Sequence, residues 1–244
     1  MTSALIAVTG VDYWTLADGT THPCGYWPEE LSTPYQVFVD AGIDITIATP
    51  GGVTPTADQV GFAPEYNGGS AEEGQRIKAH LESIAALRSP EVLEDVDAAS
   101  FDFVFVPGGH GPMEDLAVSE SFGALLRQFF DAGKPVAAVC HGPAALLPAR
   151  DDNGEWLFAG RKVTGFSNEE EHQVGFAPRA KWLLEDRLKS SGGVYSSAPD
   201  AWTGFVVVDG NLYTGQNPAS SEGIARRLVL DVVERRQAVD AGAR

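Results

Sequence analysis

The sequence contains few cysteines, and this scarcity excludes two kinds of protein. Only Cys24 and Cys140 occur among 244 residues, which is too few for the disulfide framework of a small secreted domain. The sequence has neither a CxxC pair nor a Cys/His cluster with zinc spacing, so it predicts no metal site. Free thiols persist in a reducing compartment, and a cytoplasmic location is therefore expected.

Basic residues and long apolar runs are also scarce. The chain has 17 Lys and Arg against 34 Asp and Glu, a formal net charge of −17. A surface of this charge repels phosphates, so no nucleic acid partner is expected. No apolar stretch approaches the length that spans a bilayer, so no membrane partner is expected. The first residues, MTSALIAVTG, lack a basic region and predict a strand instead of a signal peptide.

Strands and helices alternate along the chain. Short apolar runs with few charges are typical of parallel strands buried on both faces, whereas proline at a first turn and glycine at an end mark helices. The predicted strands cover residues 4–9, 44–49, 101–106, 135–139, 161–166 and 204–215. The predicted helices cover residues 28–42, with Pro34 inside, 71–87 and 119–132, and a last helix begins at Pro218.

This alternation predicts one α/β domain over residues 1–244. The sheet is expected to be doubly wound and mostly parallel, with helices on both faces. Residues 53–70 are rich in Gly, Pro and Asn and form a predicted loop-rich insertion. Ligands of such sheets bind beyond the carboxyl ends of the strands. The loops after Thr9, Val106 and Val139 start there.

Cys140 lies in VAAVCHGPAALL, where a buried strand gives way to a predicted helix. A side chain on such a sharp turn points into the crevice, and helix N–H groups would favour a thiolate there. The alternative is a small buried hydrophobic residue. Because Gly142 and Pro143 suit a turn that starts a helix, the pattern favours a nucleophile. His141 is then either its base or a cap of the helix.

Two further segments are expected at the same crevice. In PGGHGPMEDL, Gly108 and Gly109 can leave backbone N–H groups free to stabilise an oxyanion, although a plain turn is an equal alternative. His110 is interpreted as an exposed loop residue. In GYWPEEL, Glu29 or Glu30 could place a carboxylate on the thiol as general acid and base. From the residues alone, a charged first helical turn is the stronger interpretation.

Several motifs together resemble the PfpI-type superfamily, in particular its heat-shock chaperone and glyoxalase III branch, which is often labelled type 1 glutamine amidotransferase-like. They are AVCHGPAALL, FVFVPGGHGPMEDL, GYWPEELSTPYQVFVDAGIDITIATPGG, KVTGFSNEEE and LYTGQNPASS, and they run in order over nearly the whole chain. The resemblance implies a flavodoxin-like sheet and a homodimer. It also implies a site in which Cys140 is the nucleophile, beside His141 and Glu30.

The resemblance assigns the remaining roles as well. It places Gly109 and the backbone N–H of His141 at the oxyanion position. Glu171 falls where relatives orient the histidine, with Glu170 as the rival within the Glu run. Cys24 stands where relatives often carry another small residue, so pairing with Cys140 is conceivable. The insertion is longer than expected, which leaves substrate size open.

The function implied is glutathione-independent conversion of methylglyoxal, or a similar 2-oxoaldehyde, to D-lactate through a hemithioacetal on Cys140. The thiol itself acidifies the C–H bond, so no cofactor is expected. Protein deglycation and cysteine amidase or peptidase activity use the same nucleophile. A stress chaperone is the alternative of another class. A hydrolase would need His141 on the sulfur with Glu171 behind it, whereas an isomerising enzyme would need Glu30 there.

Overall fold

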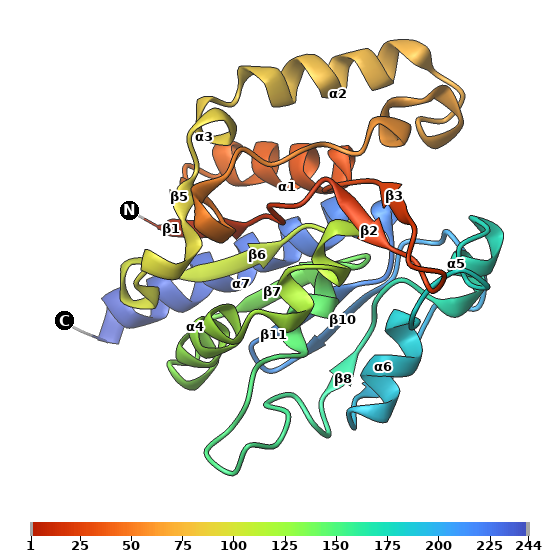
Figure 1. The fold of residues 1–244 in the computed structure, drawn as a ribbon. Helices are drawn as coiled ribbons and strands as arrows, with labels where there is room; N and C mark the ends of the chain where they lie inside the picture. Colours follow the sequence, from red (N-terminus) through yellow and green to blue (C-terminus); the bar gives the residue numbers. More distant parts are fainter. Residues whose placement is uncertain (1, 243–244) are drawn as a thin grey trace.

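A mixed seven-stranded sheet forms the centre of the protein in the computed structural model, which describes residues 2–242. Its strand order is β10-β11-β7-β6-β1-β4-β5 (Figure 1). The sheet consists of β1 (Ser3–Ala7), β4 (Asp44–Thr49), β5 (Glu91–Val92), β6 (Phe103–Val106), β7 (Val136–Val139), β10 (Val206–Asp209) and β11 (Leu212–Gly215). All neighbours pair in parallel except β10 and β11, which form an antiparallel hairpin at one edge.

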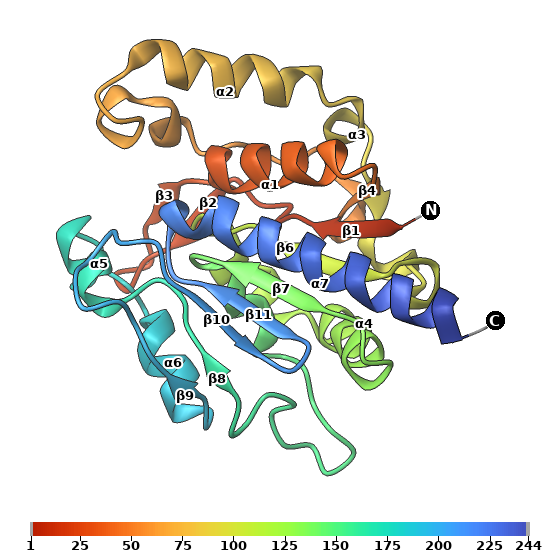
Figure 2. The ribbon, with the colours of Figure 1, turned by 180° about the vertical axis from the view of Figure 1, so that it is seen from behind.

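Helices cover both faces of this sheet, as the sequence predicted. Helices α1 (Pro28–Asp40) and α7 (Ser221–Gly242) pack side by side on one face, and α4 (Glu120–Asp131) lies on the other (Figures 1 and 2). Helix α2 (Ala71–Ser83) packs against α1 on the side away from the sheet (Figure 2). The doubly wound, mostly parallel α/β architecture is confirmed.

The core lies between the helices and the central strands. All residues of β6, β7 and β11 are buried, which explains why these strands are continuous apolar runs without alternation. Helix α7 contributes the buried side chains of Ala225 and Leu228, while Arg226 and Arg227 are exposed. Its apolar stripe therefore faces α1 and the sheet, as expected of an amphipathic helix that covers a core.

Some elements differ from the sequence prediction. The helix expected over 71–87 ends at Ser83, because Ile84 has an extended ψ of 102°, and a short helix α3 (Ala85–Arg88) follows. The insertion is not structureless, since it contains 3-10 turns at Gln59–Phe62 and Pro64–Tyr66. Within 161–166 only β8 (Lys162–Val163) is a strand, and it pairs with β9 (Val194–Tyr195) outside the main sheet.

The site region lies at the carboxyl ends of the central strands. A hairpin of β2 (Tyr13–Thr15) and β3 (Thr21–Pro23), which the sequence did not predict, extends over that end together with the segments that carry α5 (Asn168–Gln173) and α6 (Leu184–Ser190) (Figure 1). These additions arise from the loops after β1 and β7. They build walls around the crevice where a doubly wound sheet binds its ligands.

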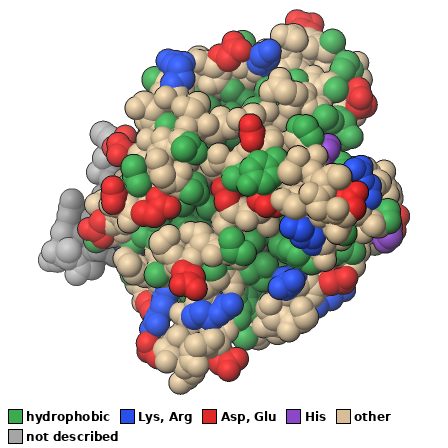
Figure 3. All heavy atoms as spheres, viewed as in Figure 1, with side chains coloured by type: hydrophobic (Ala, Val, Ile, Leu, Met, Phe, Trp, Pro, Cys, Tyr) green, Lys and Arg blue, Asp and Glu red, His purple; other side chains and the backbone are tan. Residues whose placement is uncertain are grey.

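The exposed residues include many Asp and Glu side chains. Figure 3 shows Asp and Glu dispersed across one face, with Lys and Arg between them. No helix of residues 2–242 combines the length and apolar character needed to cross a membrane.

Candidate active site

Cys140 occupies a strained turn between β7 and a 3-10 segment, Gly142–Leu146. Its φ of 61° lies in the left-handed region that non-glycine residues rarely adopt. The backbone N–H of Cys140 donates to the carbonyl of Gly215 at 2.9 Å, and its carbonyl accepts from the N–H of Phe166 at 2.8 Å. These bonds hold the turn, so that the thiol lines a pocket while being only 4% exposed.

The prediction of an α-helix directly after Cys140 is wrong. The following segment has only five residues and is 3-10 helical, so it provides no α-helical dipole to favour a thiolate. Burial instead raises the pKa of the Cys140 thiol well above its usual value, and the neighbouring Glu30 carboxyl raises it further. A hydrogen bond from the backbone N–H of Gly109 acts in the opposite direction. The state of this thiol is therefore set by the groups around it and not by a helix end.

Glu30 is completely buried although it lies in the first turn of α1. Its Oε2 accepts a hydrogen bond of 2.8 Å from the N–H of Gly108, and burial raises its pKa well above the usual range. The same carboxyl interacts with the Cys140 thiol. Oε1 has no hydrogen-bond partner of good geometry among the described residues. Glu30 is thus a carboxyl group that is readily protonated, beside a sulfur atom, with one oxygen uncommitted.

Gly108 permits this close approach. A Cβ atom at residue 108 would lie 2.7 Å from Glu30 Oε2 and 2.7 Å from the backbone nitrogen of His141. Gly109 has a φ of 85°, and a Cβ there would lie 2.3 Å from the carbonyl oxygen of Gly25. Both glycines are therefore needed for space. They bring backbone N–H groups to the sulfur and the carboxyl, where an oxyanion could be bound.

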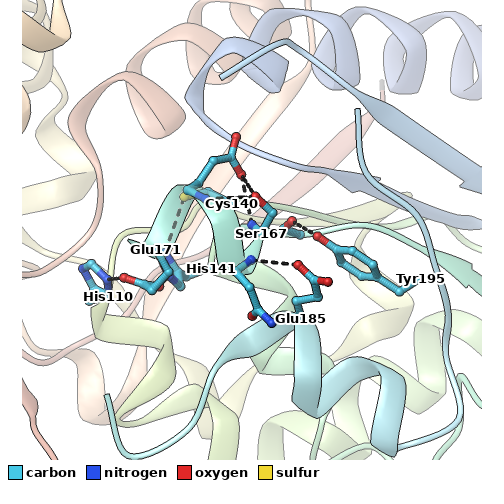
Figure 4. Close-up of polar contacts among 10 residues, drawn as sticks. His110, Cys140, His141, Ser167, Glu171, Glu185 and Tyr195 are labelled. Atoms are coloured by element: carbon cyan, nitrogen blue, oxygen red, sulfur yellow. Dashed lines mark hydrogen bonds and ion pairs between the residues drawn. The ribbon is translucent and has the colours of Figure 1, made fainter. Parts of the chain in front are cut away.

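His141 joins the thiol to a second carboxylate. Its Nδ1 lies 3.5 Å from Cys140 Sγ and its Nε2 lies 2.7 Å from Glu171 Oε2 (Figure 4). Burial lowers the pKa of His141, which favours the neutral ring. Because a carboxylate only accepts hydrogen bonds, the network assigns the proton to Nε2 and leaves Nδ1 free to accept the thiol proton.

Glu171 holds a second histidine as well. His110 Nε2 donates to Glu171 Oε1 at 3.0 Å, and the His110 ring stacks on Trp14 with centroids 4.4 Å apart. Burial acts to raise the pKa of Glu171, but the interactions with His141 and His110 outweigh it and hold that pKa well below the usual range. The expectation of an exposed His110 is wrong, because only 12% of its side chain is exposed. Trp14 lies in the unpredicted β2–β3 hairpin, which explains the error.

Glu170, the rival position, contacts other groups. Its Oε2 accepts from the N–H and hydroxyl of Ser167 in a capping box at the start of α5. Its Oε1 accepts from Asn217 Nδ2 and from the N–H of Trp202. Glu171 is thus the carboxylate that contacts His141, whereas Glu170 joins α5 to two loops. Successive helical residues point in different directions, and this separates the two.

The pocket above the thiol has a volume of about 240 Å³. Its walls are mainly aromatic, and sequence reasoning missed most of them because they lie in loops without periodicity. Beyond the thiol and His141, its lining includes His22, Trp27, Asp58, Tyr66, Gly109, His110, Phe166, Phe176 and Trp202. This is a small, largely apolar site of the kind that binds small molecules.

Cys24 is a free, buried thiol, as is Cys140. Burial raises the pKa of Cys24 far above that of an ordinary thiol, which makes it a poor nucleophile. It is not among the residues that line the pocket. The conceivable pairing of Cys24 with Cys140 is absent from this structure, and nothing in the geometry involves Cys24 in the site.

Three side chains of the site, His110, His141 and Glu171, are of types that bind metal ions. Ligand atoms of His110, His141 and Glu171 lie within 4.8 Å of one another. Two imidazoles and one carboxylate are typical metal ligands. Here both Nε2 atoms are already engaged by the carboxylate, so the geometry describes a hydrogen-bonded group.

Comparison with known proteins identifies the class. The DJ-1/PfpI family matches residues 25–230, and the chain belongs to this family. Glyoxalase 3 of Candida albicans is 28% identical over 235 residues, which cover 94% of this chain and 98% of that protein. The glutamine amidotransferase-like class 1 domain-containing protein 1 of Bos taurus is 36% identical over 197 residues, 79% of this chain and 82% of that protein.

A solved structure agrees with these sequence matches. The crystal structure of glyoxalase III from Candida albicans superposes with a TM-score of 0.82 at 27% identity, and the match covers 94% of this chain and 96% of that one. The predicted resemblance and the fold class are confirmed.

Proposed function

We propose that this protein is a glutathione-independent glyoxalase that converts methylglyoxal, or a similar 2-oxoaldehyde, to a 2-hydroxy acid such as D-lactate. The observation that carries the proposal is the fully buried Glu30, whose raised pKa and uncommitted Oε1 accompany its interaction with Cys140 Sγ. A carboxyl group whose pKa is raised in this way can both take and return a proton. The similarity to Glyoxalase 3 over nearly the full chain supports the same function.

The first step forms a carbon–sulfur bond. The Cys140 thiol transfers its proton to Nδ1 of His141, and the imidazolium is stabilised by Glu171 at 2.7 Å. The sulfur attacks the aldehyde carbon to give a hemithioacetal. The N–H groups of Gly109 and His141 stabilise the oxygen that becomes negative. These donors are fixed by the backbone and need no rearrangement.

The second step moves hydrogen between the two carbons without an external oxidant. Glu30, as carboxylate, removes the proton from the former aldehyde carbon while the His141 imidazolium protonates the ketone oxygen, and an enediolate forms. The same group returns the proton to the neighbouring carbon, which becomes the carbinol, while the first carbon becomes a thioester. Water then cleaves the carbon–sulfur bond, so that the acid leaves and the thiol is restored. The sum is the aldehyde plus water giving the 2-hydroxy acid.

A second candidate is hydrolysis of an acyl or glycation adduct by the same thiol. The contact of His141 Nδ1 with Sγ at 3.5 Å, with Glu171 behind the ring, favours it. The groups that contact the sulfur do not separate the two enzymes, because both Glu30 and His141 are its neighbours. Glu30 has no evident task in acyl hydrolysis, and this ranks glyoxalase chemistry first. Nothing in the geometry favours the chaperone alternative.

The test is the production of 2-hydroxy acid from methylglyoxal in the absence of glutathione. Wild-type protein should produce lactate, Cys140→Ser should produce none, and Glu30→Gln should lower kcat/KM by about 100-fold or more. Cys24→Ser is the matched control, since it removes the other buried thiol, and it should leave the rate unchanged. Equal lactate production by wild type and Cys140→Ser would refute the proposal.

Two further properties belong to the same proposal. We expect a homodimer in a reducing cytoplasm, where both thiols stay unpaired. Sedimentation at assay concentrations tests the oligomeric state.

A further inference from the structure

Trp202 has an unusual backbone conformation at the pocket wall. Its φ of 65° is rare for a bulky side chain, and such conformations persist only where the surrounding structure holds them. The Trp202 N–H donates to Glu170 Oε1 at 2.9 Å, and the indole Nε1 donates to Gln173 Oε1 at 2.6 Å. Both acceptors belong to α5, which also carries Glu171. The ring is thus fixed to the helix that orients His141.

The other walls of the pocket are also aromatic. The Trp202 ring meets the Phe166 ring edge to face, with the ring centroids 5.6 Å apart. The Phe166 ring in turn packs against the His141 ring, with the centroids 4.4 Å apart. Trp27 and Tyr66 form a second edge-to-face pair at 5.2 Å. All four rings line the same pocket of about 240 Å³. Since a cavity of about 150 Å³ accepts benzene, this pocket has room for an aryl group in addition to the reacting carbons.

The charge of the pocket also limits its ligands. None of its described lining residues is Lys or Arg. Its wall contains the side chain of Asp58, a residue that is only 5% exposed, and this carboxyl disfavours a substrate that carries a carboxylate. An uncharged, flat, apolar substituent fits such a site.

We propose that Trp202 determines specificity and that the pocket selects carbonyl compounds with an aromatic substituent. The proposal deepens the glyoxalase function and rests on it for the reaction. The preferred substrates are then aryl 2-oxoaldehydes. Phenylglyoxal plus water gives 2-hydroxy-2-phenylacetate by the steps above, with the same proton transfers and no added oxidant. Rings that contact a flat substituent stabilise it beyond simple burial.

The first experiment compares initial rates on three substrates. We expect kcat/KM for phenylglyoxal to exceed that for methylglyoxal by about tenfold or more, since differences of this size follow from small changes in buried apolar surface. 4-Carboxyphenylglyoxal, which adds a carboxylate to the same aryl 2-oxoaldehyde, should react more slowly than phenylglyoxal. Equal kcat/KM values for phenylglyoxal and methylglyoxal would overturn the inference and leave the glyoxalase proposal intact.

The second experiment assigns the preference to one ring. Trp202→Ala should lower the phenylglyoxal to methylglyoxal ratio by about tenfold, whereas Trp202→Phe, which keeps a ring but loses the bond to Gln173, should retain most of the ratio. Trp182→Ala is the matched control, because Trp182 lines a separate groove. Melting curves show whether each variant folds. A ratio that is the same in folded Trp202→Ala and wild type refutes the assignment.

A binding measurement separates failure of the two proposals. Acetophenone has the aryl ketone but no aldehyde, so it binds without being turned over. In Cys140→Ala we expect calorimetry to show binding of acetophenone at least about tenfold tighter than that of acetone, and loss of this difference when Trp202→Ala is added. If acetophenone is bound in this way but no 2-oxoaldehyde is converted by wild type, glyoxalase chemistry fails while the pocket's selectivity stands. If acetophenone binds no better than acetone, the selectivity fails.

Discussion

Replacing Glu29 by Gln should change how the stability of the protein depends on pH. Glu29 lies in the first turn of α1, and burial, together with the nearby charge of Glu73, raises its pKa from 4.5 to about 7. In the unfolded chain its pKa is close to the ordinary value. Between about pH 4.5 and 7 the folded protein therefore holds a proton that the unfolded chain has released.

The sign and size of the effect follow from this difference. Because the folded state binds more protons in this window, the contribution of Glu29 to the free energy of unfolding is fully present below pH 4.5. This contribution is lost as the pH rises through 7. A shift from 4.5 to about 7, at roughly 1.36 kcal/mol per unit, corresponds to about 3 kcal/mol. Gln resembles the protonated carboxyl and does not titrate. Glu29→Gln should therefore match wild type at pH 4.5 and exceed it by about 3 kcal/mol at pH 8.

Thermal melting at the two pH values measures the effect. For a protein of this size about 3 kcal/mol corresponds to a shift on the order of 10 °C. The control is Glu72→Gln, which removes the same charge from an exposed position on α2 and should give a small shift at both pH values. A Glu29→Gln shift of equal size at pH 4.5 and pH 8 would show that burial of this carboxylate is not the cause.

Three other substitutions test the site and its supports. Gly108→Ala places a methyl group 2.7 Å from Glu30 Oε2, so we expect a stability loss of about 1–3 kcal/mol and little turnover; wild-type lactate production would contradict the packing. Glu171→Gln leaves an amide behind His141, and we expect kcat/KM to fall about 100-fold, whereas a change below twofold would remove Glu171 from the mechanism. Ser167→Ala removes the cap of α5 and should cost about 1 kcal/mol in chemical denaturation, with an unchanged midpoint as the contrary result.

The parts of the fold that follow from local patterns could be predicted from the sequence. The strands of the sheet core are short apolar runs, and helices α1 and α4 lie close to their predicted bounds. The last helix was expected to begin at Pro218, but α7 begins at Ser221 after a 3-10 turn over Pro218–Ser220. The hairpin of β2 and β3 could not be predicted, because its short strands lack alternation and are fixed by packing around Trp14. The break at Ile84 is similar, since nothing in the sequence marks an extended residue there.

The candidate site was predictable only as far as neighbours along the chain were informative. The position of Cys140 at a strand end predicted its turn, and the structure shows that turn. Glu30 looked like a solvated first-turn charge, and only the approach of Gly108 from a distant strand end explains its burial. The choice between Glu170 and Glu171 depends on helix rotation and on Asn217 and Trp202, which are distant in sequence. His110 was misplaced for the same reason.

The hydrogen bonds from Trp202 to α5 limit how substitutions can change the range of substrates. Any substitution of Trp202 that enlarges the cavity also removes the hydrogen bond from the indole to Gln173. Gln173 lies on α5, the helix that also carries Glu171, the carboxylate bonded to His141. Under the proposed mechanism, a broader range of substrates that is reached through this residue also weakens the support of the proposed base, His141. Adaptation without that penalty has a separate route through Tyr66, which lies in the insertion and outside the α5 network.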